Sequence, residues 1–158
     1  MTLIDAERSA FLYRRLGPAR EVSGGSCANT IAGLASLGGR GAFIGRVRDD
    51  QLGGVFSHDI RAAGVTFRSA PSTSGPSTAT SMIFVTPDGQ RTMNTYLGAC
   101  VELGPDDVDP DLVAGAAVTY LEGYLWDRPE AKAACRKAAS ICHGAGRQLA
   151  LTLSDSFC

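Results

Sequence analysis

The sequence predicts an α/β fold with a mainly parallel sheet, and two observations support this. Short apolar segments that suit buried strands alternate with segments whose apolar residues recur at helical spacing. The last third of the chain also predicts strand, helix and strand at Val118–Glu122, Pro129–His143 and Gln148–Leu153. A crossover of this length is right-handed and leaves its two strands parallel. A chain of 158 residues is expected to form one domain or part of one.

The N-terminal third predicts two helices joined by an extended piece. Apolar residues recur near helical spacing from Leu3 to Leu16, and Gly17-Pro18 ends that helix. An extended piece at Glu21–Ser23 leads into a helix over Cys27–Leu37, whose small residues allow close packing on a sheet. Ala42–Val47 is short and apolar, which favours a strand buried on both faces.

The next segment predicts a third helix and another strand. Asp50 is a suitable N-cap for a helix over Gln51–Ala63, and Gly64 is a suitable C-terminal stop. Val65–Phe67 then favours a strand.

The centre of the chain predicts a β-hairpin. Ser72–Thr78 is rich in Ser, Thr, Pro and Gly, as is typical of a loop. Ala79–Thr86 and Arg91–Leu97 suit two strands, and Pro87–Gln90 between them supplies the turn.

Composition limits the possible partners. The net charge of −1 and the pI near 6.1 show no basic excess, so binding to nucleic acid is not expected. No apolar run is long enough to span a membrane, and no secretory signal precedes the first helix. The five cysteines form no Cys-x-x-Cys pair and indicate reduced thiols in a cytoplasmic protein. We therefore expect a small-molecule partner.

The main candidate site is the glycine pair before the second helix. Gly24 and Gly25 let the backbone approach a ligand closely, and Ser26 is expected to cap the helix. The helix N-terminus favours anionic or oxygen-rich ligands, and Asn29 lies one turn in on the same rim. An amide side chain both donates and accepts, which suits the hydroxyls of a polyol. The alternative is that this turn merely reverses the chain.

The sequence around this turn resembles the first signature of the ribokinase-like (PfkB) carbohydrate kinase family. The resemblance is carried by G-G-S-C-A-N-T-I-A-G-L-A-S-L-G-G, by A-F-I-G-R-V-R-D-D-Q-L-G and by H-D-I-R-A-A-G-V. The later segments Y-L-E-G-Y-L-W and L-T-L-S-D-S-F-C are similar to the adenosine kinase branch in particular. The resemblance to the family extends over nearly the whole chain from Glu21 onward. Ile31, where the signature prefers a small residue, and Arg48, where many sugar kinases have Gly, depart from it.

The resemblance implies a ribokinase-like three-layer sandwich with a mainly parallel sheet and a small β lid, whose hairpin is about residues 79–97. It also implies that Gly24, Gly25 and Asn29 contact the sugar, with Ser26 beside them, and that the full-length relative uses ATP and Mg²⁺. Arg91 matches a position where the adenosine kinase branch places an arginine near the phosphoryl-transfer site, although it could be a solvated hairpin residue. Leu97, Ala99 and Cys100 either line the base or sugar pocket or belong to the core.

Some parts of the family pattern have no counterpart in this sequence. The catalytic Asp of the family lies in a Gly-Ala-Gly-Asp segment, which does not occur, and Gly144–Arg147 is interpreted as a helix stop. The opening strand with its sugar-binding Asp has no clear match, because Leu3-Ile4-Asp5 is assigned to a helix. We therefore expect residues 1–158 to be the substrate-side, N-terminal half of the domain without the ATP-binding half, inactive alone and binding no cofactor by itself.

No catalytic residue or metal site is predicted in the chain. Asp50 is better explained as a helix cap than as a metal ligand paired with Asp49. An acidic cluster broken by two prolines favours a loop that begins a helix. That cluster consists of Asp106, Asp107, Asp109 and Asp111. Trp126 either stacks on a base or packs at the sheet edge.

Two functions remain open from the sequence. The first is an ATP-dependent phosphotransferase acting on an alcohol group of a sugar or nucleoside, represented here by its substrate-side part. The alternative is a non-catalytic small-molecule-binding or dimerising module derived from such a kinase, with the lid strands pairing edge to edge in a homodimer.

Overall fold

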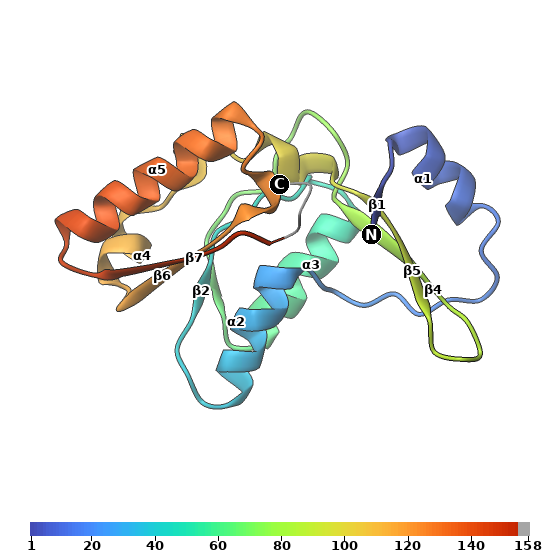
Figure 1. Cartoon of the computed structure of the whole chain (residues 1–158), viewed down its shortest axis with the longest axis horizontal. Helices are drawn as coiled ribbons and strands as arrows, with labels where there is room; N and C mark the ends of the chain where they lie inside the picture. The colour runs from blue at the N-terminus through green and yellow to red at the C-terminus, as the bar shows by residue number, and fades with distance from the viewer. Residues whose placement is uncertain (155–158) are drawn as a thin grey trace.

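The computed structural model describes residues 1–154, and its elements alternate between helix and strand (Figure 1). In chain order the elements are β1 (Thr2–Leu3), α1 (Ala6–Tyr13), α2 (Ser26–Ser36), β2 (Ala42–Phe43), α3 (Gln51–Ala62), β3 (Thr66–Phe67), β4 (Thr80–Val85), β5 (Arg91–Tyr96), the 3₁₀ turns η1 (Gly98–Glu102) and η2 (Pro105–Asp107), α4 (Pro110–Gly115), β6 (Val118–Glu122), the 3₁₀ turn η3 (Gly123–Leu125), α5 (Pro129–Gly144) and β7 (Gln148–Thr152). The predicted α/β class is confirmed.

The strands pair in three sets within the described residues. β2 pairs with β3 and β6 with β7, both in parallel. In the third set β5 lies between β1 and β4, parallel to β1 and antiparallel to β4. Figure 1 shows α4, α5 and the β6–β7 pair at one end of the molecule, α1 and the hairpin at the other, and α2 and α3 between them.

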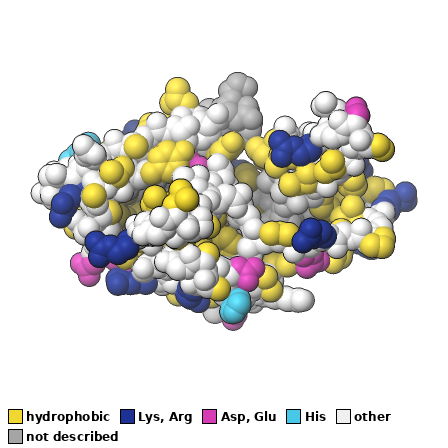
Figure 2. Space-filling model, turned by 90° about the horizontal axis from the view of Figure 1, so that it is seen from below, with side chains coloured by type: hydrophobic (Ala, Val, Ile, Leu, Met, Phe, Trp, Pro, Cys, Tyr) yellow, Lys and Arg dark blue, Asp and Glu magenta, His cyan; other side chains and the backbone are white. Residues whose placement is uncertain are grey.

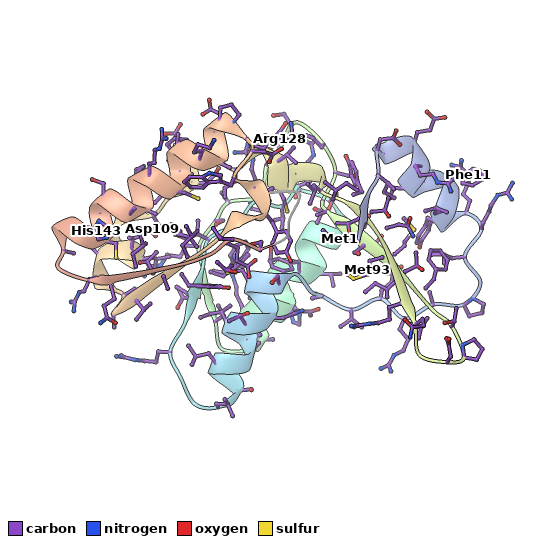
Figure 3. All side chains as sticks on the ribbon, viewed as in Figure 1. Met1, Phe11, Met93, Asp109, Arg128 and His143 are labelled. Carbon is purple, nitrogen blue, oxygen red and sulfur yellow. The ribbon has the colours of Figure 1, made fainter. Side chains whose placement is uncertain are left out.

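Two apolar cores pack these helices and strands together. Ala28 of α2 and Ile60 of α3 pack with Phe67 of β3 in the first core. Ala134 and Ala138 of α5 pack with Val113 of α4 in the second. Small alanines on α5 let this helix lie close to the β6–β7 pair. Arg128 and His143 mark the two ends of α5 (Figure 3).

The predicted strand Ala42–Val47 is shorter than expected, and its expected burial on both faces is wrong, because Ala42 is exposed and Phe43 is only partly buried. Val47 belongs to the first core and Phe43 packs against that core, whereas Ile44 packs against the second core. Only Ala42 and Phe43 form ladder pairs, because the partner strand β3 is two residues long. The Phe43 ring then occupies the space beside Gly45, where a Cβ would lie 2.5 Å from it.

The predicted helix from Leu3 to Leu16 is wrong at both ends. Thr2 and Leu3 form β1 by pairing with Asn94 and Thr95 of β5, a partner that local spacing cannot reveal. The assignment of Leu3-Ile4-Asp5 to a helix is therefore wrong, and a short strand does open the chain. Asp5 then caps α1 by accepting a hydrogen bond from the Arg8 N–H at 2.7 Å. Met1 directly precedes β1, Met93 lies on β5, and Phe11 lies on α1 (Figure 3).

Other predicted boundaries are confirmed to within a residue or two. The Asp50 carboxylate accepts from the Gly53 N–H and begins α3, and Gly64 follows the helix with a φ of 85°. The hairpin forms around Pro87–Gln90. Asp109 caps α4, as expected of the acidic loop, and Pro129 opens α5. None of the described helices is long and apolar enough to cross a membrane.

Candidate functional site

The glycine pair forms an exposed turn at the N-terminus of α2. Gly25 is the N-cap residue, with a φ of 116° that L side chains rarely adopt, and no side chain caps the helix. The prediction that Ser26 caps α2 is wrong, because Ser26 is already the first helical residue. The leading N–H groups of α2 therefore have no side-chain cap.

Asn29 stands beside this turn, as the sequence predicts. A Cβ built on Gly24 would lie 3.9 Å from Oδ1 of Asn29, so the glycine leaves open space next to the amide. The Asn29 N–H donates to the Gly25 carbonyl at 2.8 Å, which fixes the start of the helix. Gly24, Gly25, Ser26 and Asn29 are all exposed, and no described side chain fills the corner.

Glu122 is a site residue that the sequence reasoning missed. The Ser26 hydroxyl donates to Oε1 of Glu122 at 2.8 Å, across 96 positions of the chain. Glu122 is the last residue of β6. Ligands of parallel α/β sheets bind outside the carboxyl ends of the strands, so a carboxylate directly after an apolar strand was the available signal.

The carboxylate of Glu122 changes the chemistry of its neighbours. Burial, with a further contribution from Glu122, raises the pKa of the Cys27 thiol to about 11. Burial and then Glu122 also raise the pKa of Tyr120, which lies on the same strand. Both groups therefore stay protonated and uncharged near neutral pH.

A second serine–carboxylate hydrogen bond lies on the other side of the glycine pair. Ser23 Oγ donates to Oδ2 of Asp59 on α3 at 2.6 Å. The other oxygen, Oδ1, lies 3.0 Å from Nδ1 of His58. The twin glycines are thus held between one tie to α3 and another to β6.

The segment after β2 is joined to the start of the hairpin through Asp50. Its carboxylate accepts from the Thr78 N–H at 2.9 Å and from the Thr78 hydroxyl at 2.7 Å, in addition to capping α3. Partial burial opposes ionisation of Asp50, but the hydrogen bonds from Thr78 and Gly53 outweigh it and lower its pKa. The carboxylate therefore fixes the turn from Asp50 to Gly53 against the base of the hairpin.

The structure separates the other two predicted site residues. Arg91 is exposed at the tip end of β5, and Leu97 follows the opposite end, about 20 Å away for a strand of this length. Leu97 lines a cavity of about 230 Å³ between β1, β5 and η1. Ala99 has no exposed surface and belongs to the core, which is one of the two alternatives that the sequence left open for it, whereas Cys100 is half-buried.

The twin-glycine corner is an open surface and is not part of a described cavity. The Leu97 cavity does not include it, and neither does a hollow of about 650 Å³ along α3 lined by Ser57, His58 and Arg61. Lys132 of α5 lies over the Trp126 ring, 5.4 Å from its centroid.

Charge is mixed on the surface. Figure 2 shows positive and negative side chains interspersed on the face that it presents. Within residues 1–154 no group of three or more His, Cys, Asp or Glu side chains is placed to hold a metal ion. Cys27, Cys100, Cys135 and Cys142 are free thiols, and the segment 155–158, which includes Cys158, lies outside the described residues.

The corner can recognise an alcohol-rich molecule. It offers free helix N–H donors, the Asn29 amide, which donates and accepts, and the Glu122 carboxylate, which accepts. The absence of side chains at Gly24 and Gly25 allows close approach. The carboxylates of Glu122 and Asp59 each hold a serine hydroxyl here, so recognition is the chemistry that these residues support.

Comparison with known proteins identifies a family and several relatives. Residues 15–158 match the family described as pfkB family carbohydrate kinase. Among curated proteins, the chain is 27% identical to a probable fructokinase-4 of Arabidopsis thaliana over 128 residues, or 80% of this chain and 39% of that protein.

Two solved bacterial structures are similar over the whole chain. The adenosine kinase from Sinorhizobium meliloti is 64% identical with a TM-score of 0.93, and the match covers 99% of this chain and 48% of that one. A probable sugar kinase from Rhizobium etli CFN 42 is 62% identical with a TM-score of 0.94, covering 100% and 48%. The chain therefore spans about half the length of the proteins that it resembles, and the expected ribokinase-like α/β fold is confirmed.

Proposed function

This chain belongs to the pfkB family of carbohydrate kinases, and from that premise we propose that it forms the acceptor-binding part of an ATP-dependent kinase of a sugar or nucleoside. The observation that carries this proposal is the open Gly24-Gly25 turn, with the Asn29 amide beside it and the Glu122 carboxylate hydrogen-bonded to the next residue, Ser26. The 64% identity to a bacterial adenosine kinase favours a nucleoside acceptor.

The roles follow from the positions of the groups. The N–H groups at the start of α2 and the Asn29 amide bind acceptor hydroxyls. Glu122 accepts a hydrogen bond from another hydroxyl or keeps the Ser26 side chain oriented toward one. Leu97 lines a separate cavity and Arg91 lies at the far end of β5, so in this proposal both reach the acceptor only when the hairpin moves over it. Leu97 then supplies apolar surface, and Arg91 approaches the phosphate oxygens.

ATP and Mg²⁺ are assigned to the complete kinase and not to the described residues. Those residues contain no carboxylate or histidine cluster for a metal ion, and the sequence contains no Gly-Ala-Gly-Asp segment. Bound ATP supplies the transferred phosphoryl group. We expect residues 1–158 alone to bind the acceptor weakly and to transfer no phosphate.

Calorimetry on the 158-residue chain tests this proposal. Adenosine, ribose and fructose are titrated into the wild type and into Asn29→Ala. Weak binding of adenosine that Asn29→Ala reduces about tenfold supports the proposal. Equal affinity in both proteins would mean that the ligand binds elsewhere. Submicromolar affinity, or phosphate transfer by the 158-residue chain alone, would contradict the expectation that this chain binds the acceptor weakly and transfers no phosphate.

A second candidate function is a module that pairs through its lid. β4 is the edge strand of its sheet, and it exposes Ile83, Phe84 and Val85 in succession. Such an edge can pair with a second copy. Sedimentation of the wild type and of Val85→Lys tests this, because a dimer that persists in the variant contradicts edge pairing.

A further inference from the structure

We propose that Asp59 is a positioning residue: by accepting the Ser23 hydroxyl, it fixes the twin-glycine turn and thereby sets the affinity of the corner for its acceptor. The acceptor in this inference rests on the proposed function. The effect on the turn itself does not, and the two are tested separately below.

The hydrogen bond is short and charge-assisted. Ser23 Oγ lies 2.6 Å from Oδ2 of Asp59, and His58 Nδ1 lies 3.0 Å from the other oxygen. Hydrogen bonds from Ser23 and then from His58 lower the pKa of Asp59, so the carboxylate is ionised at neutral pH. Ionised acceptors form stronger hydrogen bonds than neutral ones.

The carboxylate stands on an element that is fixed relative to α2. Ile60, the next residue of α3, is buried in the same core as Ala28 of α2. Protein cores are close-packed, so α2 and α3 cannot shift independently without leaving voids. Asp59 is therefore a rigid anchor for whatever precedes α2.

The segment before α2 needs such an anchor. Residues 17–25 contain no helix or strand, and Ser23 is the one residue among them that is not exposed. Gly24 and Gly25 carry no side chains that could pack, and Gly25 has no side-chain cap partner. On the N-terminal side of the turn, the Ser23–Asp59 hydrogen bond ties this segment to α3, whereas a second side-chain bond, from the Tyr13 hydroxyl to Glu21 Oε1 at 3.2 Å, ties it only to the end of α1.

Loss of this tie acts on binding through conformational freedom. Glycine has more backbone freedom to lose than any other residue, so an untied turn samples many conformations. A ligand that needs one of them binds more weakly, in proportion to the population of that conformation. Affinity for the acceptor falls while the fold remains.

The test measures amide hydrogen exchange by NMR and adenosine affinity by calorimetry in the same proteins. Ser23→Ala, Asp59→Ala and the double variant remove the tie, and Asp59→Asn keeps an oxygen that accepts. His58→Ala is the matched control, because it leaves Ser23 and Asp59 in place. Urea unfolding of each protein separates a local effect from a global one.

We expect exchange of the Gly24, Gly25 and Ser26 amides to rise about tenfold in both single variants, with little further change in the double variant. The α5 amides stay protected, His58→Ala resembles the wild type, and Asp59→Asn lies between. Adenosine affinity falls about five- to tenfold in the variants with faster exchange.

The outcomes separate the two proposals. The positioning role is overturned if amide exchange at the glycines is unchanged in the variants, or if exchange rises over the whole chain. It is also overturned if the wild type binds adenosine and the variants bind it with the same affinity. If the turn loosens as expected but the wild type binds neither adenosine, ribose nor fructose, the structural role of Asp59 stands and the proposed function fails.

Discussion

Ser26 donates a hydrogen bond of 2.8 Å to Glu122, which ties the first residue of α2 to the last residue of β6. The bond sets a carboxylate beside the N-terminus of a helix, where the helix dipole favours negative charge. Ser26 does not cap its own helix, since Gly25 is the N-cap residue and Ser26 is already the first helical residue. Four predictions follow from this corner and its supports.

Replacing Glu122 with Gln removes the charge but keeps an oxygen that accepts from Ser26. Since Glu122 contributes, after burial, to the raised Cys27 pKa of about 11, that pKa falls in the variant. We expect alkylation of Cys27 by iodoacetamide at about pH 9 to accelerate roughly two- to tenfold, measured by peptide mass spectrometry. Cys135, whose pKa is raised by burial alone, is the internal control. No change at Cys27 contradicts the electrostatic link.

Alanine at Gly25 and alanine at Gly24 have different effects. Gly25 has a φ of 116°, so Gly25→Ala strains the backbone and costs about 1–2 kcal/mol of the free energy of unfolding. At Gly24 the new methyl group meets only Asn29 Oδ1, at 3.9 Å, and stability changes by less than about 0.5 kcal/mol. Urea unfolding measures both, and an equal loss in the two variants would show that the turn conformation is not the cause.

Two adjacent glycines of α3 give a sharper contrast. A Cβ on Gly53 would lie 1.9 Å from the Arg48 carbonyl oxygen, so Gly53→Ala forces α3 away from the turn and costs more than about 3 kcal/mol. Gly54 faces open space on the exposed side of α3, so Gly54→Ala raises the free energy of unfolding by about 0.5–1 kcal/mol. Thermal unfolding decides this, and destabilisation by Gly54→Ala contradicts the packing described for α3.

Asp50 makes stability depend on acidic pH. Its folded-state pKa is depressed below the ordinary value of 3.8, so its contribution is present above that value and is lost as the pH falls through the folded pKa. Asp50→Ala therefore costs about 1–2 kcal/mol at neutral pH, and this difference from the wild type shrinks below about pH 4.

The control for Asp50 is Asp106→Ala, at an exposed carboxylate, which changes stability by less than about 0.5 kcal/mol. Urea unfolding at several pH values compares the proteins. A difference between the wild type and Asp50→Ala that stays constant down to about pH 3 argues against the hydrogen bonds to Thr78 as its source.

The elements that sequence reasoning placed correctly are those whose signals are local. Asp50 and Gly64 bracket α3 through bonds within four residues of the helix ends, and Pro87–Gln90 closes the hairpin within its own turn. β1 was missed because its two residues become a strand only by pairing with β5. The short β2 strand likewise depends on the length of its partner.

Local sequence signals were enough to predict the α/β class, the hairpin and the place of the glycine turn with Asn29, because cap, turn and periodicity signals act over a few neighbouring residues. The surroundings of that turn could be known only from the folded chain. Ser23 meets Asp59 across 36 residues and Ser26 meets Glu122 across 96. Such partners are chosen by the packing of whole helices and strands, which no local pattern encodes.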